Sequence, residues 1–107
     1  MATAPWHVVG DGSGRATDRS CDHLAAVAPQ DPTPPRSCVD CVAEGSDWVH
    51  LRQCLVCGDV RCCDSSPRRH ATAHWHATAH AVMRSTEPGE DWGWCYPDEL
   101  MLAPGDA

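Results

Sequence analysis

The sequence contains no phenylalanine, no isoleucine and no lysine, and only one tyrosine. Its five leucines and nine valines make up about 13% of the 107 residues. An ordinary globular domain draws at least roughly 20% of its residues from the large aliphatic types and phenylalanine. This shortage excludes a fold held together by a large aliphatic core. A chain of this length therefore needs another kind of crosslink.

Two further absences narrow the possible partners. No apolar run approaches the roughly 18 residues needed to cross a bilayer, and residues 1–20 lack the charged leader and apolar segment of a secretory signal. The net charge is -7 and the eight arginines form no basic stripe, whereas phosphate backbones require clustered cations. We therefore expect a cytoplasmic protein with reduced thiols, no membrane contact and no nucleic-acid partner.

The chain is predicted to hold one folded unit between two tails. Residues 1–20 are rich in Gly, Ser, Thr and Asp and are expected to form a flexible N-terminal tail, with a C-terminal tail over residues 103–107. The domain between them, residues 21–102, is predicted to adopt a small α+β fold with an antiparallel sheet. We expect strands at 48–52, 60–62, 81–84 and 99–102, and a short helix at 22–28. Ser66 followed by Pro67 predicts the start of a helix that runs to about Ala77.

Cysteine and histidine are what the sequence has in excess. Two Cys-x2-Cys pairs, Cys38/Cys41 and Cys54/Cys57, can each offer two thiolates to one tetrahedral zinc ion. Further thiols and imidazoles follow between residues 62 and 80, with Cys21-x-His23 upstream and Cys95 downstream. In a reduced chain with few aliphatic residues, this density of ligands predicts metal binding, not disulfides.

One simple interpretation of the spacing fails. Cys54-x2-Cys57-x12-His70-x3-His74 matches a DNA-binding C2H2 finger. Such a finger needs apolar residues where this chain has Arg61 and Pro67, and it leaves six cysteines without a role. The acidic charge also opposes DNA binding.

The complete order of ligands resembles the UBP-type zinc finger, the ubiquitin-binding module of ubiquitin-specific proteases and of a histone deacetylase. The resemblance covers about residues 21–102, and residues 89–96 also look like the small free-standing bacterial members. It implies two crossed zinc sites and, in members with three zinc ions, a third one. Asp98 stands where the family places the last cysteine of that third site, so two or three zinc ions are implied. The implied ligands are Cys38, Cys41, Cys62 and His70 for the first site, Cys54, Cys57, His74 and His80 for the second, and Cys21, His23, Cys95 and Asp98 for the third.

The resemblance also implies a binding module for a protein or peptide, with a chain terminus among the candidate ligands. In the family, aromatic residues and an arginine receive the C-terminal carboxylate of ubiquitin. Trp94 and Tyr96 match that aromatic lining and Trp48 matches it approximately, but Asp64 stands in place of the arginine. A carboxylate there argues against binding the ubiquitin C-terminus. An amine-bearing tail facing Asp64 is the corresponding hypothesis.

Other function classes remain open beside this one. A zinc-dependent hydrolase would need an open coordination position, whereas four protein ligands close a structural site, so we expect no enzyme activity. Thiol chemistry at the adjacent Cys62 and Cys63 would compete with zinc for Cys62. A zinc store would need labile, exposed thiolates, and rapid release of zinc to a chelating dye would distinguish it from a binding module.

Overall fold

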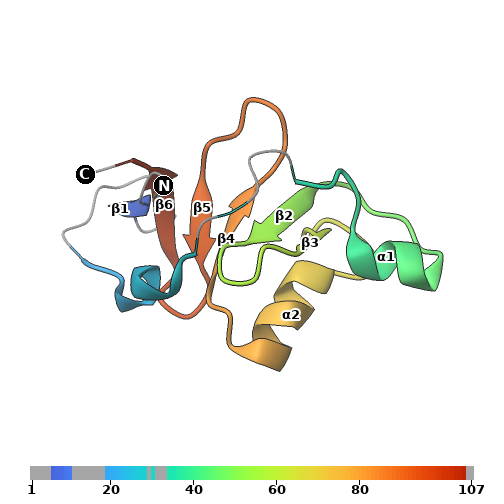
Figure 1. Cartoon of the computed structure of the whole chain (residues 1–107), viewed down its shortest axis with the longest axis horizontal. Helices are drawn as coiled ribbons and strands as arrows, with labels where there is room; N and C mark the ends of the chain where they lie inside the picture. Colours follow the sequence, from blue (N-terminus) through green and yellow to red (C-terminus); the bar gives the residue numbers. More distant parts are fainter. Residues whose placement is uncertain (1–5, 11–18, 29, 31–33, 106–107) are drawn as a thin grey trace.

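The computed structural model describes residues 6–10, 19–28, 30 and 34–105. They form a six-stranded antiparallel sheet with two α-helices and one 3-10 helix (Figure 1). The strands lie in the order β1-β6-β5-β4-β2-β3. The small α+β fold expected from the sequence is therefore confirmed. The elements are β1 Trp6–Gly10, η1 Asp22–Ala26, α1 Val39–Glu44, β2 Leu51–Cys54, β3 Val60–Cys62, α2 His70–Thr78, β4 Val82–Ser85, β5 Gly93–Cys95 and β6 Leu100–Pro104.

The pairing of strands divides the side chains of the sheet into two faces. Met83 pairs with Cys54 on one side and with Trp94 on the other, so these three residues share a face. Val82 pairs with Cys95, which pairs with Leu100, so these three share the opposite face. The first face carries the polar and aromatic side chains that lie near α2, and the second carries the aliphatic core.

The core consists of two small clusters of buried residues. The larger contains Leu55, Val82, Leu100 and Leu102, with Trp6 packed against it. The smaller contains only two aliphatic residues beside three buried cysteines. The scarcity of leucine and valine thus leads to a core in which thiols occupy much of the buried space.

The expectation of tails is corrected at both ends. Trp6–Gly10, within the stretch expected to be flexible, form β1, which pairs antiparallel with β6 from Trp6↔Pro104 to Gly10↔Met101. Residues 103 and 104 belong to β6 and not to a C-terminal tail. Trp6 and Val8 pack against the larger core cluster, and this burial explains why the strand forms. Residues 1–5, 11–18 and 106–107 lie outside the described residues.

The helix predicted to start at Ser66–Pro67 begins instead at His70. Arg69 adopts a left-handed conformation (φ 47, ψ 48), which interrupts a helical path from Pro67. Ser66 is buried, and its hydroxyl accepts a hydrogen bond from the Val49 backbone N–H (2.9 Å) and so does not cap the helix. The His70 N–H donates to Cys62 Sγ (3.2 Å), and this bond secures the start of α2.

The strand expected at 48–52 is observed at Leu51–Cys54, because the loop before it has other hydrogen-bond partners. Those partners are Ser66 for Val49 and the Cys63 N–H for the His50 carbonyl (3.0 Å). The short helix expected at 22–28 is confirmed as η1. Helix α1 and strand β5 were not expected. Gly45, in the left-handed region at φ 74, ends α1.

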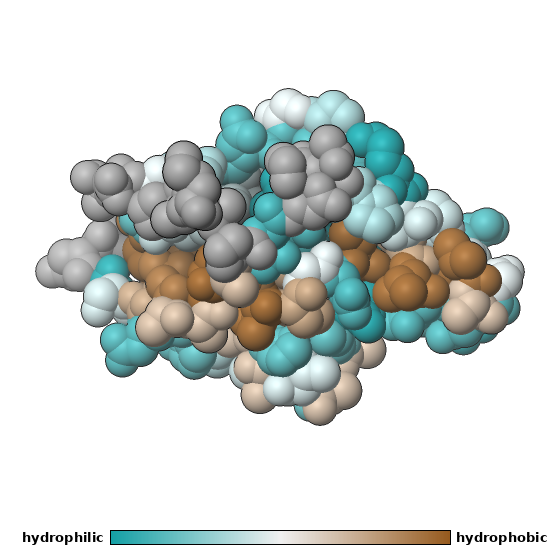
Figure 2. All heavy atoms as spheres, viewed as in Figure 1, coloured by the Kyte–Doolittle hydropathy of each residue, from teal (hydrophilic) through white to brown (hydrophobic). Residues whose placement is uncertain are grey.

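Helix α1 extends from the β3 edge of the sheet and exposes apolar side chains (Figures 1 and 2). Val39 and Val42 are 49% and 62% exposed. Among the described residues, no helix has the length and apolarity that crossing a membrane demands.

Candidate metal centres and an aromatic cleft

The first cluster joins α1, β3 and α2. Cys38 is the N-cap of α1 and Cys41 lies in its first turn, whereas Cys62 ends β3 and His70 begins α2. His70 Nδ1 lies 3.4 Å, 3.3 Å and 3.5 Å from the Sγ atoms of Cys38, Cys41 and Cys62, and Cys41 Sγ lies 3.8 Å from Cys62 Sγ. Tetrahedral zinc at its usual bond lengths requires about 3.5 Å between sulfur and nitrogen and about 3.8 Å between two sulfurs. The four ligand atoms therefore have the spacing of a zinc site.

The surroundings of this cluster also fit a cation. Burial, followed by the neighbouring thiols, raises the pKa of Cys41 to about 11, so this buried thiol needs a positive ion beside it to ionise at neutral pH. The Cys41 backbone N–H donates to Cys38 Sγ (3.3 Å). His70 Nε2 lies 3.0 Å from Glu44 Oε2. A carboxylate at that place orients the imidazole and leaves Nδ1 for the metal.

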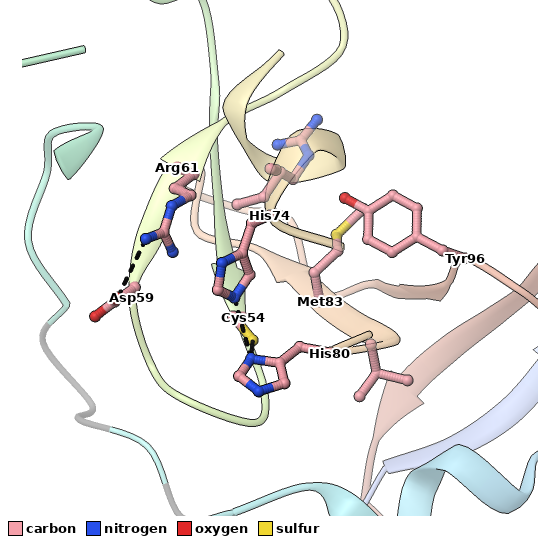
Figure 3. A pocket seen from close by; sticks show the side chains of 10 residues that line it. Cys54, Asp59, Arg61, His74, His80, Met83 and Tyr96 are labelled. Carbon is pink, nitrogen blue, oxygen red and sulfur yellow. Dashed lines mark hydrogen bonds and ion pairs between the residues drawn. The ribbon is translucent and has the colours of Figure 1, made fainter. Parts of the chain in front are cut away.

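The second cluster joins the end of β2, the turn after it, the middle of α2 and the segment that follows α2. Cys54 Sγ lies 3.6 Å from His80 Nδ1, Cys57 Sγ lies 3.5 Å from His74 Nε2, and the two imidazole nitrogens are 3.1 Å apart. Gly58 closes the turn at φ 86, a conformation that favours glycine. Figure 3 shows His74 and His80 pointing toward each other beside Cys54.

A cavity of about 10 Å³ lies next to this cluster (Figure 3). Arg61 lines it and pairs with Asp40 (Nε to Oδ2, 2.8 Å) and Asp59 (Nη2 to Oδ2, 3.4 Å). Burial opposes ionisation of Arg61, but the hydrogen bond and charge of Asp40 outweigh it and raise its pKa. The salt bridges hold Arg61 as a fixed cation beside the second cluster.

The third cluster joins the N-terminal segment to the last two strands. Cys21 and His23 come from the start of η1, Cys95 ends β5 and Asp98 lies in the turn before β6. His23 Nδ1 lies 3.9 Å from Cys21 Sγ, 3.5 Å from Cys95 Sγ and 3.0 Å from Asp98 Oδ2. Burial, followed by Cys21 and Asp98, raises the pKa of Cys95 to about 12. Asp98 thus lies with the other three residues, where its carboxylate oxygen could serve as the fourth ligand.

The structure brings the twelve proposed ligands together in the three predicted groups. Within each group all ligand atoms lie within 4.8 Å of one another. Zinc binds cysteine sulfur, histidine nitrogen and carboxylate oxygen in sets of four, so the three clusters could hold zinc ions. Cys63 and His76 lie outside all three groups. Helix α2 carries His70 of the first group and His74 of the second, and so links the two.

A cleft of about 320 Å³ lies between α2 and strands β4 and β5. Trp94 and Tyr96 both line it together with Asp64. Trp48 does not line this cleft and packs against the smaller core cluster. The other lining residues are Arg52, Cys63, Ser65, Thr72, Trp75, His76, Met83 and Trp92.

The lining of this aromatic cleft is ordered by specific contacts. The rings of Trp75 and Tyr96 stack in parallel, with centroids 5.9 Å apart and an interplanar angle of 2°. The Thr72 hydroxyl donates to Asp64 Oδ1 at 2.5 Å. Arg52 Cζ lies 4.7 Å from the Trp92 ring centroid, within the range of a cation–π contact. The cleft therefore has aromatic walls and separate positive and negative groups.

Sequence reasoning missed several of these residues. Trp75 and Thr72 are three residues apart on α2, and this helical spacing could have placed both on one face. Arg52 and Gln53 are consecutive residues of β2, so their side chains point to opposite faces of the sheet. This assigns Arg52 to one face but does not predict a cleft there. The role of Glu44 could not be predicted from the sequence, because it contacts His70 across a separation of 26 residues.

Comparison with known proteins places the chain among zinc-binding modules. The family model described as "Zn-finger in ubiquitin-hydrolases and other protein" matches residues 38–106. Among solved structures, the chain is similar to a protein from Rhodopseudomonas palustris determined by NMR in solution, with 46% identity and a TM-score of 0.69. The similarity covers 84% of this chain and 87% of that one. No curated protein matches the chain.

Proposed function

The chain belongs to the zf-UBP family, the zinc fingers of ubiquitin hydrolases and other proteins, and we propose that it is a zinc-stabilised module that binds a protein or peptide. In this proposal zinc occupies the three clusters and has a structural role. The partner occupies the aromatic cleft. The thiolate ligands require a reducing environment, for which we propose the cytoplasm.

The position of the aromatic cleft relative to the clusters carries this proposal. One wall is α2, whose His70 and His74 belong to the first two clusters, and the other wall includes β5, whose Cys95 belongs to the third. Zinc in all three clusters would fix both walls. Half-buried tryptophan and tyrosine side chains in a preformed cleft are typical of recognition surfaces. The volume of about 320 Å³ suits one or two side chains of a peptide.

The same geometry disfavours an enzyme. Each cluster offers four protein ligands, and a closed tetrahedral shell leaves no position for a reacting water. The zf-UBP family is a zinc-finger binding module and not a catalytic family.

The charges of the molecule favour a partner other than the ubiquitin C-terminus, nucleic acid or a membrane surface. Asp64 places a carboxylate in the aromatic cleft, where it would repel the carboxylate of a chain terminus. The net charge of -7 would likewise repel phosphate backbones and anionic lipids.

The five tryptophans provide a direct test. Trp75, Trp92 and Trp94 line the aromatic cleft, whereas Trp6 and Trp48 pack against the two core clusters. We would load the full chain with zinc and titrate it with mixtures of degenerate peptides while recording the indole N–H signals by NMR. Binding in the cleft should shift the signals of Trp75, Trp92 and Trp94 and leave those of Trp6 and Trp48 in place.

Two results would contradict the proposal. One is the absence of any shift at millimolar peptide. The other is a set of shifts confined to Trp6 or Trp48, which would place the binding surface elsewhere.

A further inference from the structure

We infer that the aromatic cleft selects a lysine side chain of the bound peptide, with the ammonium group at Asp64 and the aliphatic stem against the rings. This inference rests on the proposed function, because it names the chemistry that the same cleft recognises. Its support is the arrangement of rings and charges among the lining residues.

The walls of the cleft suit a long apolar stem that ends in a cation. Trp94 and Met83 are paired across β5 and β4, so they form one continuous apolar surface. Trp75 and Tyr96 stand beside them as a parallel stack. A lysine stem packs well against such surfaces while its ammonium stays at a polar edge. The aromatic faces also attract cations electrostatically.

Three ionisable side chains line the cleft besides the phenol and the buried thiol: Arg52, Asp64 and His76. Arg52 is already engaged. Its Nη1 donates to the Leu51 carbonyl (3.0 Å) and to Ser85 Oγ (3.2 Å), and it lies 4.0 Å from Glu90 Oε1. Its guanidinium also covers the Trp92 ring. Glu90 therefore offsets the positive charge of this wall.

Asp64 is the group available to a ligand. It is exposed, and its Oδ1 accepts one hydrogen bond from Thr72. Among the described residues, no cation pairs with Asp64. His76, on α2, is exposed and lies at the same cleft. A lysine ammonium would supply the positively charged partner that the Asp64 carboxylate lacks. The net charge of -7 would also favour the approach of a cation.

The test uses the zinc-loaded full chain and short peptides with both ends blocked. The peptides are identical except for the central residue, which is lysine, trimethyl-lysine, norleucine or glutamate. A fifth peptide has norleucine at its centre and a free N-terminal ammonium. The indole N–H signals of Trp75, Trp92 and Trp94 report occupancy of the cleft. We expect the lysine peptide to bind at least fivefold more tightly than the norleucine peptide.

Asp64→Asn should abolish this preference, because it removes the charge and keeps the shape of the side chain. Asp91→Asn is the matched control, since Asp91 is also exposed but does not line the aromatic cleft; it should retain the preference. Zinc content by native mass spectrometry and the tryptophan circular dichroism should be unchanged in both variants. These measurements separate a loss of binding from a loss of fold.

Each other outcome has a defined meaning. Equal binding of the lysine and norleucine peptides overturns the inference and leaves the proposed function intact. Tighter binding of the glutamate peptide, lost in Arg52→Gln, overturns it in favour of anion recognition by Arg52. Tighter binding of the free N-terminal ammonium overturns lysine as the source of the cation. If none of the five peptides binds, the inference is overturned. The proposed function is then decided separately, by the titration with degenerate peptide mixtures.

Discussion

Gly93 lies where two neighbouring elements leave no room for a side chain. A Cβ atom at this position would come 2.8 Å from the Met83 carbonyl oxygen and 3.1 Å from a ring carbon of Trp6. The first contact is with backbone, which cannot rotate away. We predict that Gly93→Ala lowers the free energy of unfolding by about 1–3 kcal/mol, the usual cost of overpacking. Denaturant unfolding of the zinc-loaded protein measures this change.

A second variant tests the origin of that cost. If the Trp6 ring contributes, Trp6→Leu combined with Gly93→Ala should cost less than the sum of the two single changes. An unfolding midpoint in Gly93→Ala equal to that of the parent chain would mean that the Met83 carbonyl oxygen and the Trp6 ring lie too far from Gly93 to contact the added methyl group.

We predict that Asp98 decides the number of tightly held zinc ions. Its carboxylate lies 3.0 Å from His23 Nδ1 and stands with two buried thiols. With zinc bound to all three clusters, native mass spectrometry should count three ions per chain. Asp98→Ala should reduce the count to two, because two thiols and one imidazole remain. Asp98→Cys should keep three and slow the loss of the third ion to a chelator, since thiolate is the softer ligand that zinc binds well.

The matched control for Asp98 is Glu99→Ala, an exposed acidic residue next to it that belongs to no cluster. It should leave the zinc count at three. A count of two in the parent chain that Asp98→Cys does not raise would show that Cys21, His23 and Cys95 pack together without a metal.

At the residue scale, spacing alone predicted the two Cys-x2-Cys pairs but not their partners. Cys38-x2-Cys41 and Cys54-x2-Cys57 are local patterns, because two cysteines three positions apart must lie on one turn. Their crossed pairing with His70 and with His74 and His80 came only through the family resemblance. The aromatic cleft could not be predicted in full, because Arg52 and Trp75 meet the other lining residues only after the sheet has formed.

At the scale of elements, metal ligands explain where sequence reasoning was wrong. Helix α1 is six residues long, and the thiol of Cys38 accepts from the Cys41 N–H at its start. A cysteine is not a usual N-cap, so the sequence carried no signal for this helix. Strand β5 consists of Gly93, Trp94 and Cys95, none of which is charged, so its sequence shows no alternation of polar and apolar residues. The strand at 60–62 was confirmed, as its central residue is less buried than the two beside it.

Strand β1 is the element whose removal is most informative, because no cluster residue precedes Cys21. We predict that a chain without residues 1–10 keeps its zinc count and loses stability. Trp6 and Val8 would no longer cover the larger core cluster, and β6 would become an unpaired edge. Hydrogen exchange should accelerate at β6 amides, and the unfolding temperature should fall.

The control for this truncation is a chain without residues 1–5 only, which retains β1. It should exchange and unfold like the full chain. Equal exchange at β6 in all three chains would contradict the pairing of β1 with β6.

At the scale of the whole molecule, each of the three clusters brings together parts of the chain that are far apart in the sequence. The first two connect α1, β2, β3 and α2, and the third connects η1 to the turn between β5 and β6. Structural zinc contributes on the order of 10–16 kcal/mol of apparent folding free energy per site. That exceeds the net stability of an ordinary small domain, about 5–15 kcal/mol, so the fold should depend on its metal.

Zinc removal should therefore unfold the protein in two stages. The third cluster should empty first, because Asp98 replaces a thiolate and the His23 side chain is 41% exposed. At that stage the NMR signals of η1 and β6 should change while the far-ultraviolet circular dichroism of α2 persists. Emptying the first two clusters should then abolish the helical signal, since α2 carries a ligand of each and begins at one of them. Titration with a chelator, followed by both signals and by native mass spectrometry, measures the order. A single transition in which helix and β6 signals vanish together would mean that the three clusters form one cooperative unit, and a metal-free chain with native tryptophan signals would mean that the small core suffices without zinc.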